Sequence, residues 1–223
     1  MHTAELLSIQ VGLPKTLRHQ GFPDDADREW DSGIFKDAAN GRVFVGRENL
    51  AGDGQADLRV HGGPDRAVLI FSKLHYAGWE AELGHPIPNG GFGENFTVSD
   101  LTEDEVCLGD QWSIGEVVLE VSQPRLPCFK LARRLNAEGL NVKVMHAMAG
   151  GWYCRVLQEG HVEDGQALDL QKRPHPDWTI RRAFREYIFG KQNHDALAEL
   201  RDLPALSTLW KEGIQTKLEK RDA

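Results

Sequence analysis

The chain has 223 residues, of which 40% are hydrophobic and 27% are charged. A chain of this length and composition can bury a substantial core, which excludes disorder as its default state and favours one large domain or a domain with an appendage. The formal net charge of −8 argues against a protein that binds nucleic acid polymers regardless of their sequence.

The longest apolar run, residues 67–71, is far shorter than the roughly 20 residues that a membrane-spanning helix needs. The N-terminus has neither the basic start nor the apolar stretch of a secretory signal. The three cysteines, Cys107, Cys128 and Cys154, show no CxxC spacing, which argues against a disulfide framework and a structural zinc site. We therefore expect a cytoplasmic protein that does not bind membranes.

Short apolar segments between glycines dominate the chain up to about residue 171 and predict β-strands. The predicted strands cover residues 6–11, 42–45, 66–71, 106–108, 111–114, 117–121, 152–157 and 167–170. Gly115 separates two of these segments, as in a tight hairpin. Many short antiparallel strands favour a mainly β fold, and specifically a closed β-barrel.

Helical spacing of apolar residues interrupts this pattern and predicts short inserted helices at 73–83, 128–135 and 142–148. Two prolines, Pro174 and Pro176, then predict a stiff connector, because proline ends both strands and helices. We place a domain boundary there. The predicted domains are a barrel at 1–173 and a helical domain at 174–223.

The helical domain is predicted to contain three short helices. The first covers 180–188, with Asp177 as its N-cap and Gly190 after its end; the second covers 193–202, and the third begins near Ser207. About 45 residues cannot bury much surface by themselves, so we expect these helices to pack on the barrel or on a second subunit in a homodimer.

Cys128 lies in Gln123-Pro124-Arg125-Leu126-Pro127-Cys128-Phe129-Lys130, where a predicted strand ends and a helix begins. We expect Pro127 at the first helical position, which places the Cys128 sulfur near free backbone N–H groups. Arg125 and Lys130 add positive charge, so the thiolate form is favoured for metal ligation or nucleophilic attack. The alternative is a small buried apolar cysteine, which is our interpretation of Cys107 and Cys154.

Two glycine-rich segments accompany this motif. Gly62 and Gly63 lie between arginines, and such a segment forms either a cradle for a phosphate or oxyanion or an ordinary tight turn. Residues 89–97 lack the strand–GxGxxG–helix pattern of a dinucleotide site. Glu94 and Asn95 could hydrogen-bond a heterocycle, but the composition favours a polar turn.

Residues 60–67, 92–96 and 123–131 resemble, in order and spacing, the motifs of MOSC-domain proteins, which are named after the C-terminal domain of molybdenum cofactor sulfurase. With three helices after the barrel, the chain is most similar to the YiiM-like subgroup. The resemblance implies a pyruvate-kinase-like barrel that binds molybdopterin, with Cys128 as molybdenum ligand or sulfur carrier. The candidate cofactor contacts in and beside the motifs are Arg59, His61, Gly62, Gly63, Arg66, Asn95, Gln123, Arg125 and Lys130.

The resemblance also implies a reductase that acts on small N-hydroxylated compounds such as 6-hydroxylaminopurine, with Cys128 as its catalytic residue. The chain lacks the closely spaced cysteines of an iron–sulfur cluster, so we expect electrons from a separate donor protein.

Three alternatives stay open. Cys128 could carry a persulfide delivered by a pyridoxal-phosphate-dependent desulfurase, or the chain could bind molybdopterin without turnover. It could also be a cysteine hydrolase that pairs Cys128 with His61.

Overall fold

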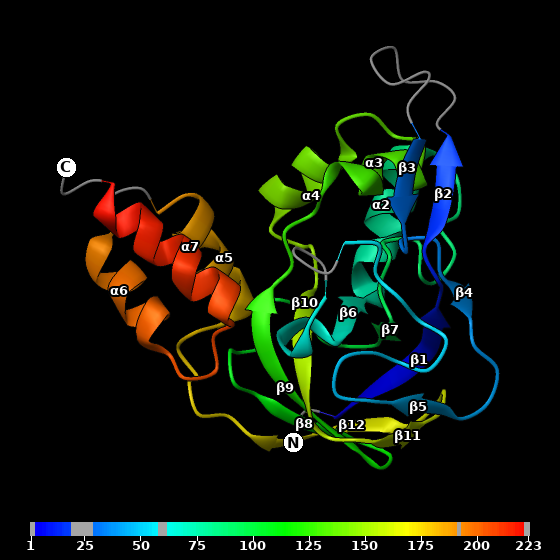
Figure 1. The fold of residues 1–223 in the computed structure, drawn as a ribbon, viewed down its shortest axis with the longest axis horizontal. Helices are drawn as coiled ribbons and strands as arrows, with labels where there is room; N and C mark the ends of the chain where they lie inside the picture. Colours follow the sequence, from blue (N-terminus) through cyan, green and yellow to red (C-terminus); the bar gives the residue numbers. More distant parts are fainter. Residues whose placement is uncertain (1–2, 19–28, 58–61, 191–192, 221–223) are drawn as a thin grey trace.

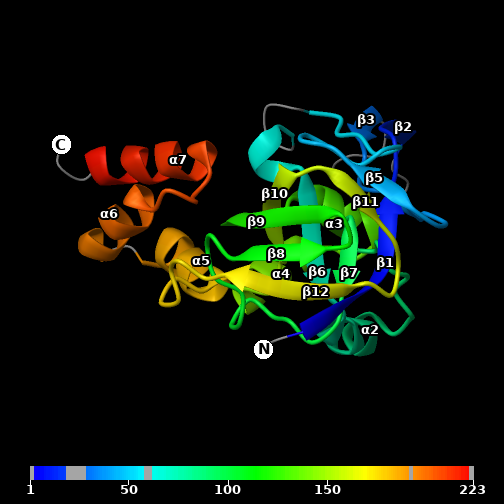
Figure 2. The same ribbon diagram turned by 90° about the horizontal axis from the view of Figure 1, so that it is seen from below.

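The computed structural model describes residues 3–18, 29–57, 62–190 and 193–220. A β-barrel lies beside a group of three C-terminal helices, and shorter helices cover one end of the barrel (Figure 1). The molecule is therefore elongated, with the C-terminal helices at one end of its long axis (Figure 2).

Seven strands close the barrel. They are β1 (Thr3–Val11), β6 (Val68–Ser72), β7 (Phe96–Val98), β8 (Gln111–Ile114), β9 (Val117–Pro124), β10 (Trp152–Gln158) and β12 (Ala167–Lys172). Their order is β12-β8-β9-β10-β6-β7-β1, and β12 pairs with β1 to complete the ring. All neighbours are antiparallel except β6 and β7, which are parallel. The predicted closed barrel is confirmed.

Alternating side chains fill the barrel. On β10, Trp152, Cys154 and Val156 are at most 3% exposed and belong to the main core, which confirms the interpretation of Cys154 as a packing residue. The predicted hairpin is also confirmed, because Ile114 pairs with Val117 around Gly115, whose φ is +55°. A positive φ of this kind favours glycine.

Several small strands were not predicted. A short strand, β4 (Asp37–Ala38), adds to the outside of β1. Two two-stranded sheets pair β2 (Lys15–Arg18) with β3 (Glu29–Ser32), and β5 (Val43–Val45) with β11 (Gly160–Val162). Of these four strands, β5 confirms the strand predicted at 42–45. β2 and β3 lie mostly exposed and are rich in polar residues, so they lack the apolar alternation that predicts a strand.

Two strand predictions need correction. Residues 106–108 form a loop rather than a strand, and in it Cys107 makes an isolated bridge to Thr179. Val106 and Leu108 are buried, so this segment has the apolar pattern of a strand but no continuous strand partner. The strand predicted from Arg66 begins at Val68, because Pro64–Arg66 forms a 3-10 turn, η1.

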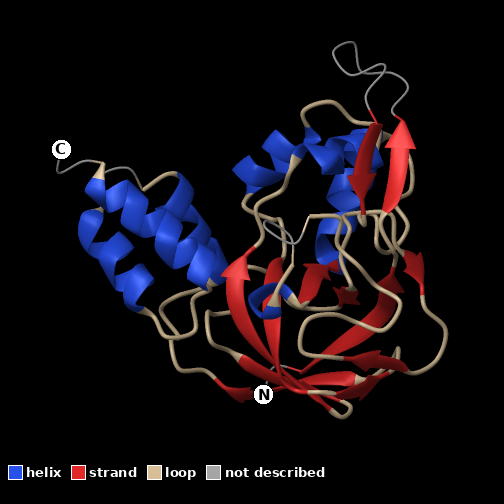
Figure 3. Cartoon of the chain, in the orientation of Figure 1, coloured by secondary structure: helices blue, strands red, loops and turns tan. Residues whose placement is uncertain are grey.

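The helices predicted inside the barrel domain are confirmed, with small shifts at their ends. A 3-10 turn, η2 (Lys73–His75), leads into α2 (Tyr76–Leu83), and α3 (Phe129–Arg134) and α4 (Leu140–Ala147) follow β9 (Figure 3). They enclose a second, smaller core in which the rings of Phe71 and Phe92 stack with centroids 4.2 Å apart.

The C-terminal helices are α5 (Ile180–Ile188), α6 (His194–Asp202) and α7 (Thr208–Glu219). Their apolar residues, including Ile180, Trp210 and Ile214, belong to the same core as the barrel interior, so the helices pack on the barrel as expected. Asp177 as N-cap is wrong: the Thr179 hydroxyl accepts the Arg182 N–H at 3.1 Å and caps α5. Within the described residues, no helix is both long and apolar enough to cross a bilayer.

Candidate functional site

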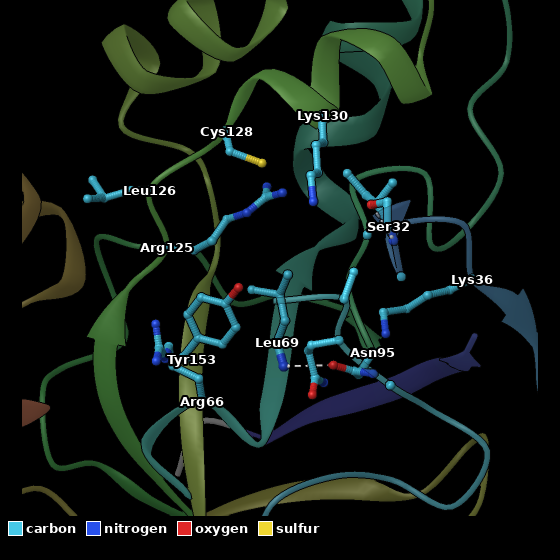
Figure 4. A pocket seen from close by; sticks show the side chains of 16 residues that line it. Ser32, Lys36, Arg66, Leu69, Asn95, Arg125, Leu126, Cys128, Lys130 and Tyr153 are labelled. Atoms are coloured by element: carbon cyan, nitrogen blue, oxygen red, sulfur yellow. Dashed lines mark hydrogen bonds between the residues drawn. The ribbon is translucent and has the colours of Figure 1, made fainter. Parts of the chain in front are cut away.

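A pocket lies between the barrel and α3. It brings together five of the predicted site residues, Arg66, Asn95, Arg125, Cys128 and Lys130 (Figure 4). These residues come from η1, the loop before β7, the end of β9 and the start of α3. The fold thus joins segments that are up to 64 residues apart, from Arg66 to Lys130, into one site.

Cys128 occupies the N-cap position of α3, and its sulfur faces into the pocket (Figure 4). Pro127 therefore precedes the helix, and the prediction that places it at the first helical position is wrong. The physical reason is that Arg125 continues the sheet pairing through its N–H to the Gly151 carbonyl (3.0 Å), and the chain stays extended through Cys128. The cysteine is partly buried rather than a core residue.

Three cationic side chains on this side of the pocket are anchored by backbone carbonyls. Arg125 is 5% exposed, and its Nη2 donates to the Phe92 carbonyl at 2.9 Å. Arg66 donates through Nε to the Gly62 carbonyl at 2.9 Å, and Lys130 Nζ donates to the Asp31 carbonyl at 2.7 Å. For Arg125 and Lys130, these printed anchors are uncharged carbonyls, which position the two cations without neutralising them.

A fourth cation, Lys36, lies on the opposite side of the pocket and was not predicted. Its ammonium group pairs with the Asp53 carboxylate, and both side chains are almost completely buried. Burial lowers the pKa of Lys36, although the attraction of Asp53 opposes this shift.

Asn95 connects this ion pair to the barrel. Its Nδ2 donates to Asp53 Oδ2 at 2.8 Å, and its Oδ1 accepts the Leu69 N–H at 3.1 Å. Asp53 Oδ1 also accepts the Gly12 N–H at 2.9 Å. The carboxylate is therefore occupied by several donors, which makes this side of the pocket rigid.

Residues 89–92 form a turn, as the composition favours, but Glu94 and Asn95 are 0% and 4% exposed, so the segment is buried. The Glu94 carboxylate accepts the N–H groups of Gly90 (2.8 Å) and Phe92 (3.1 Å) and the Tyr76 hydroxyl. Burial and this carboxylate together raise the pKa of the Tyr76 phenol. Glu94 thus satisfies the backbone donors of the glycine-rich loop from inside the protein.

Three other predicted site residues that the structure describes, Gly62, Gly63 and Gln123, do not line the pocket. Gly62 supports Arg66, and Gly63, with φ +91°, begins η1 in a conformation that favours glycine. Gln123 is 3% exposed, and its Oε1 has no hydrogen-bond partner among the described residues. Arg59 and His61 lie outside the described residues, so their assignments stay predictions.

Further lining residues escaped the sequence analysis, among them Ser32, Gln55 and Tyr153. Ser32 and Gln55 belong to segments without a recognisable motif. Tyr153 could have been found, because it alternates with Trp152 and Cys154 on β10 and must therefore face away from the core.

Comparison with known proteins agrees with this architecture. The MOSC domain family matches residues 57–169, and the YiiM-like, 3-alpha helix domain family matches residues 178–221. The chain belongs to the MOSC-domain family, in its YiiM-like group.

Individual relatives cover nearly the whole chain. The uncharacterized protein YflK of Bacillus subtilis is 39% identical over 96% of this chain and 95% of its own length. The crystal structure of YiiM from Geobacillus stearothermophilus superposes with a TM-score of 0.80 at 34% identity, over 96% of this chain and 99% of that one.

A third relative has a different length. A protein of Gibberella moniliformis described as "Reductase" is 35% identical over 79% of this chain, but the match covers only 32% of that protein. The present chain thus corresponds to about a third of that relative.

The pocket fits the cofactor that gives the family its name. Within the described residues, no group of three or more His, Cys, Asp or Glu side chains is placed to hold a metal ion. Molybdenum bound here would take Cys128 as its protein ligand and its remaining sulfur ligands from the cofactor. Lys36, Arg66, Arg125 and Lys130 carry N–H donors of the kind that a phosphate would need, which a purely apolar pocket would lack.

Proposed function

We propose that this protein is a molybdenum-cofactor-dependent reductase of small N-hydroxylated compounds, in which Cys128 ligates molybdenum. One observation carries the proposal: a single pocket combines one thiol with four cationic side chains, Lys36, Arg66, Arg125 and Lys130. A thiolate suits a soft metal centre, and guanidinium and ammonium groups suit a phosphate.

In this proposal the polar groups of the pocket have two different tasks. Cys128 and Arg125 hold the metal end of the cofactor, while Lys36, Arg66 and Lys130 offer donors to its phosphate and polar edges. When bound, the cofactor supplies two-electron redox chemistry at molybdenum. Asn95 acts indirectly, because both ends of its side chain hold Asp53 and the backbone of β6.

The proposed reaction requires electrons from a source outside this chain. Reduction of an N-hydroxyl group consumes two electrons and two protons, breaks the N–O bond and releases the amine and one water. We infer that a separate electron-donor protein supplies the electrons. The larger Gibberella relative described as a reductase supports a reductive role for this domain.

The test is a reductase assay on protein produced in a host that makes the cofactor, with 6-hydroxylaminopurine as substrate and reduced methyl viologen as electron source. The wild type should form the amine, and Cys128→Ser should lose nearly all activity. Cys107→Ser is the matched control, because Cys107 lies outside the pocket and donates only to the Pro176 carbonyl, which a hydroxyl can also do.

Other outcomes would replace the proposal. A Cys128→Ser protein with full activity would contradict it. A sulfur adduct on Cys128 in protein without molybdenum would instead indicate a persulfide carrier. Bound cofactor without turnover of any N-hydroxylated compound would indicate a cofactor-binding module.

A further inference from the structure

Tyr153 is the aromatic residue that the barrel presents to the pocket. It lies on β10 between Trp152 and Cys154, whose side chains are buried in the barrel core. Because side chains alternate along a strand, Tyr153 faces the other way, and it lines the pocket together with Cys128. Figure 4 shows its ring below Arg125, with the hydroxyl directed into the pocket.

The backbone around Tyr153 is fixed on both sides. Tyr153 pairs with Leu69 on β6 and with Gln123 on β9, and its carbonyl accepts the Ser122 hydroxyl at 3.0 Å. Leu69 also lines the pocket. The phenol ring and Leu69 therefore form a rigid, largely apolar floor beside the charged groups.

The hydroxyl of Tyr153 is available to a ligand. Among the described residues, no side chain or backbone group forms a hydrogen bond with it, in contrast to the Tyr76 hydroxyl, which donates to Glu94. Burial raises the pKa of the Tyr153 phenol above its ordinary value, although the charges of Arg125 and Arg66 oppose this shift. The group therefore stays protonated near neutral pH and can donate a hydrogen bond.

The position of Tyr153 separates it from the anion contacts. The cations of the pocket suit a phosphate, whereas a neutral donor on an apolar floor suits an uncharged, flat molecule that carries an acceptor atom. A planar heterocycle with ring nitrogens has this chemistry, and Tyr153 and Cys128 line the same pocket.

We propose that Tyr153 is a specificity-determining residue, whose ring packs against a planar N-hydroxylated heterocycle and whose hydroxyl donates a hydrogen bond to an acceptor on it. This inference rests on the proposed function. It adds that the pocket selects heterocyclic substrates over small N-hydroxylated amines that have no ring.

The test compares wild type, Tyr153→Phe and Tyr153→Leu as cofactor-loaded proteins. Two measurements are needed for each: the equilibrium Kd of 6-hydroxylaminopurine and the KM for its reduction. N-methylhydroxylamine, which has no ring, serves as the comparison substrate. Tyr187→Phe is the matched control, because Tyr187 lies on α5 outside this pocket.

The Tyr153→Phe variant should raise the Kd and the KM for the purine by about threefold to tenfold, the range for one lost hydrogen bond between neutral groups. The Tyr153→Leu variant should raise them further because it also removes the ring. The KM for N-methylhydroxylamine, the molybdenum content and the pterin content should stay at wild-type values in both variants.

The other possible results separate a failure of the role proposed for Tyr153 from a failure of the reductase proposal. Unchanged Kd and KM in both variants would overturn the role of Tyr153 and leave the reductase proposal intact. Loss of pterin in Tyr153→Phe would overturn it by making Tyr153 a cofactor contact. If the wild type binds the purine through Tyr153 but does not reduce it, the reductase proposal alone is contradicted. If the wild type neither binds nor reduces the purine, the reductase proposal and the role of Tyr153 are both contradicted.

Discussion

The two sides of the pocket are built in opposite ways. On the cysteine side, formed by Arg125, Cys128 and Tyr153, the thiol and the phenol make no side-chain hydrogen bonds to described residues. On the lysine side, formed by Lys36, Asp53 and Asn95, carboxylate and amide groups are held by each other and by the backbone. The comparison shows a wall whose carboxylate and amide groups are held within the protein, facing a wall whose thiol and phenol are left for a ligand.

The largest expected effect is on the lysine side. Asp53→Asn keeps the shape of the side chain but leaves the Lys36 ammonium buried without its carboxylate, so the free energy of unfolding should fall by about 3–5 kcal/mol. Urea denaturation of the cofactor-free protein measures this. The double variant Lys36→Met/Asp53→Asn should recover part of the loss, because it removes the unpaired charge but still leaves an amide NH2 facing a donor that the carboxylate accepted.

The control for this prediction is an exposed ion pair. Arg18 and Glu29 pair at 2.7 Å across β2 and β3, with 78% and 54% of their side chains exposed. Glu29→Gln should therefore cost less than about 1 kcal/mol. A loss in Asp53→Asn no greater than that in Glu29→Gln would show that the lysine side is not the rigid wall described above.

The next effect is on cofactor retention. Arg125→Lys preserves the positive charge but removes the guanidinium group, which both donates to the Phe92 carbonyl and lines the pocket. When the cofactor is present at limiting concentration, the amount of bound pterin should therefore fall at least about tenfold. A fluorescent pterin assay measures this. Arg173→Lys is the control, because Arg173 pairs with Asp110 outside the pocket. Equal pterin content in both variants would exclude Arg125 as a cofactor contact.

A smaller effect distinguishes the three thiols. Burial raises the pKa of Cys107 to about 11 and also raises the pKa of Cys154, whereas Cys128 is partly exposed in the pocket. At pH 8 both buried residues therefore stay protonated and shielded. Iodoacetamide should label Cys128 alone in native cofactor-free protein and all three cysteines after unfolding, as measured by mass spectrometry. Labelling of Cys107 or Cys154 at a similar rate would contradict this assignment.

The barrel and the presence of Arg125 and Cys128 at the end of a strand could be predicted from the sequence, because local patterns determine both, whereas Tyr153 was missed. Apolar runs between glycines gave most of the barrel strands, and prolines beside Cys128 marked the end of a strand and the start of a helix. The error at Pro127 arose because its conformation depends on Arg125, which pairs with Gly151 across the sheet. Such pairing between distant residues is not encoded in local spacing.

The lysine side could not be predicted for the same reason. Lys36, Asp53 and Asn95 are separated by 17 and 42 residues and meet only when the barrel has closed. A lone lysine or aspartate in a loop is indistinguishable in sequence from a solvated one. Only Asn95 was identified, through its motif; its Nδ2 donates to Asp53, and its assignment as a cofactor contact stays a prediction.

The most direct test of the central claim is the metal and pterin content of the pocket. Wild type, Cys128→Ala and Cys107→Ser should be produced in a host that makes the cofactor and analysed by inductively coupled plasma mass spectrometry and the pterin assay. We predict near-stoichiometric molybdenum and pterin in the wild type and in Cys107→Ser, and loss of molybdenum in Cys128→Ala. Molybdenum retained at the wild-type level in Cys128→Ala, or absent from the wild type, would contradict the proposal that Cys128 ligates the metal.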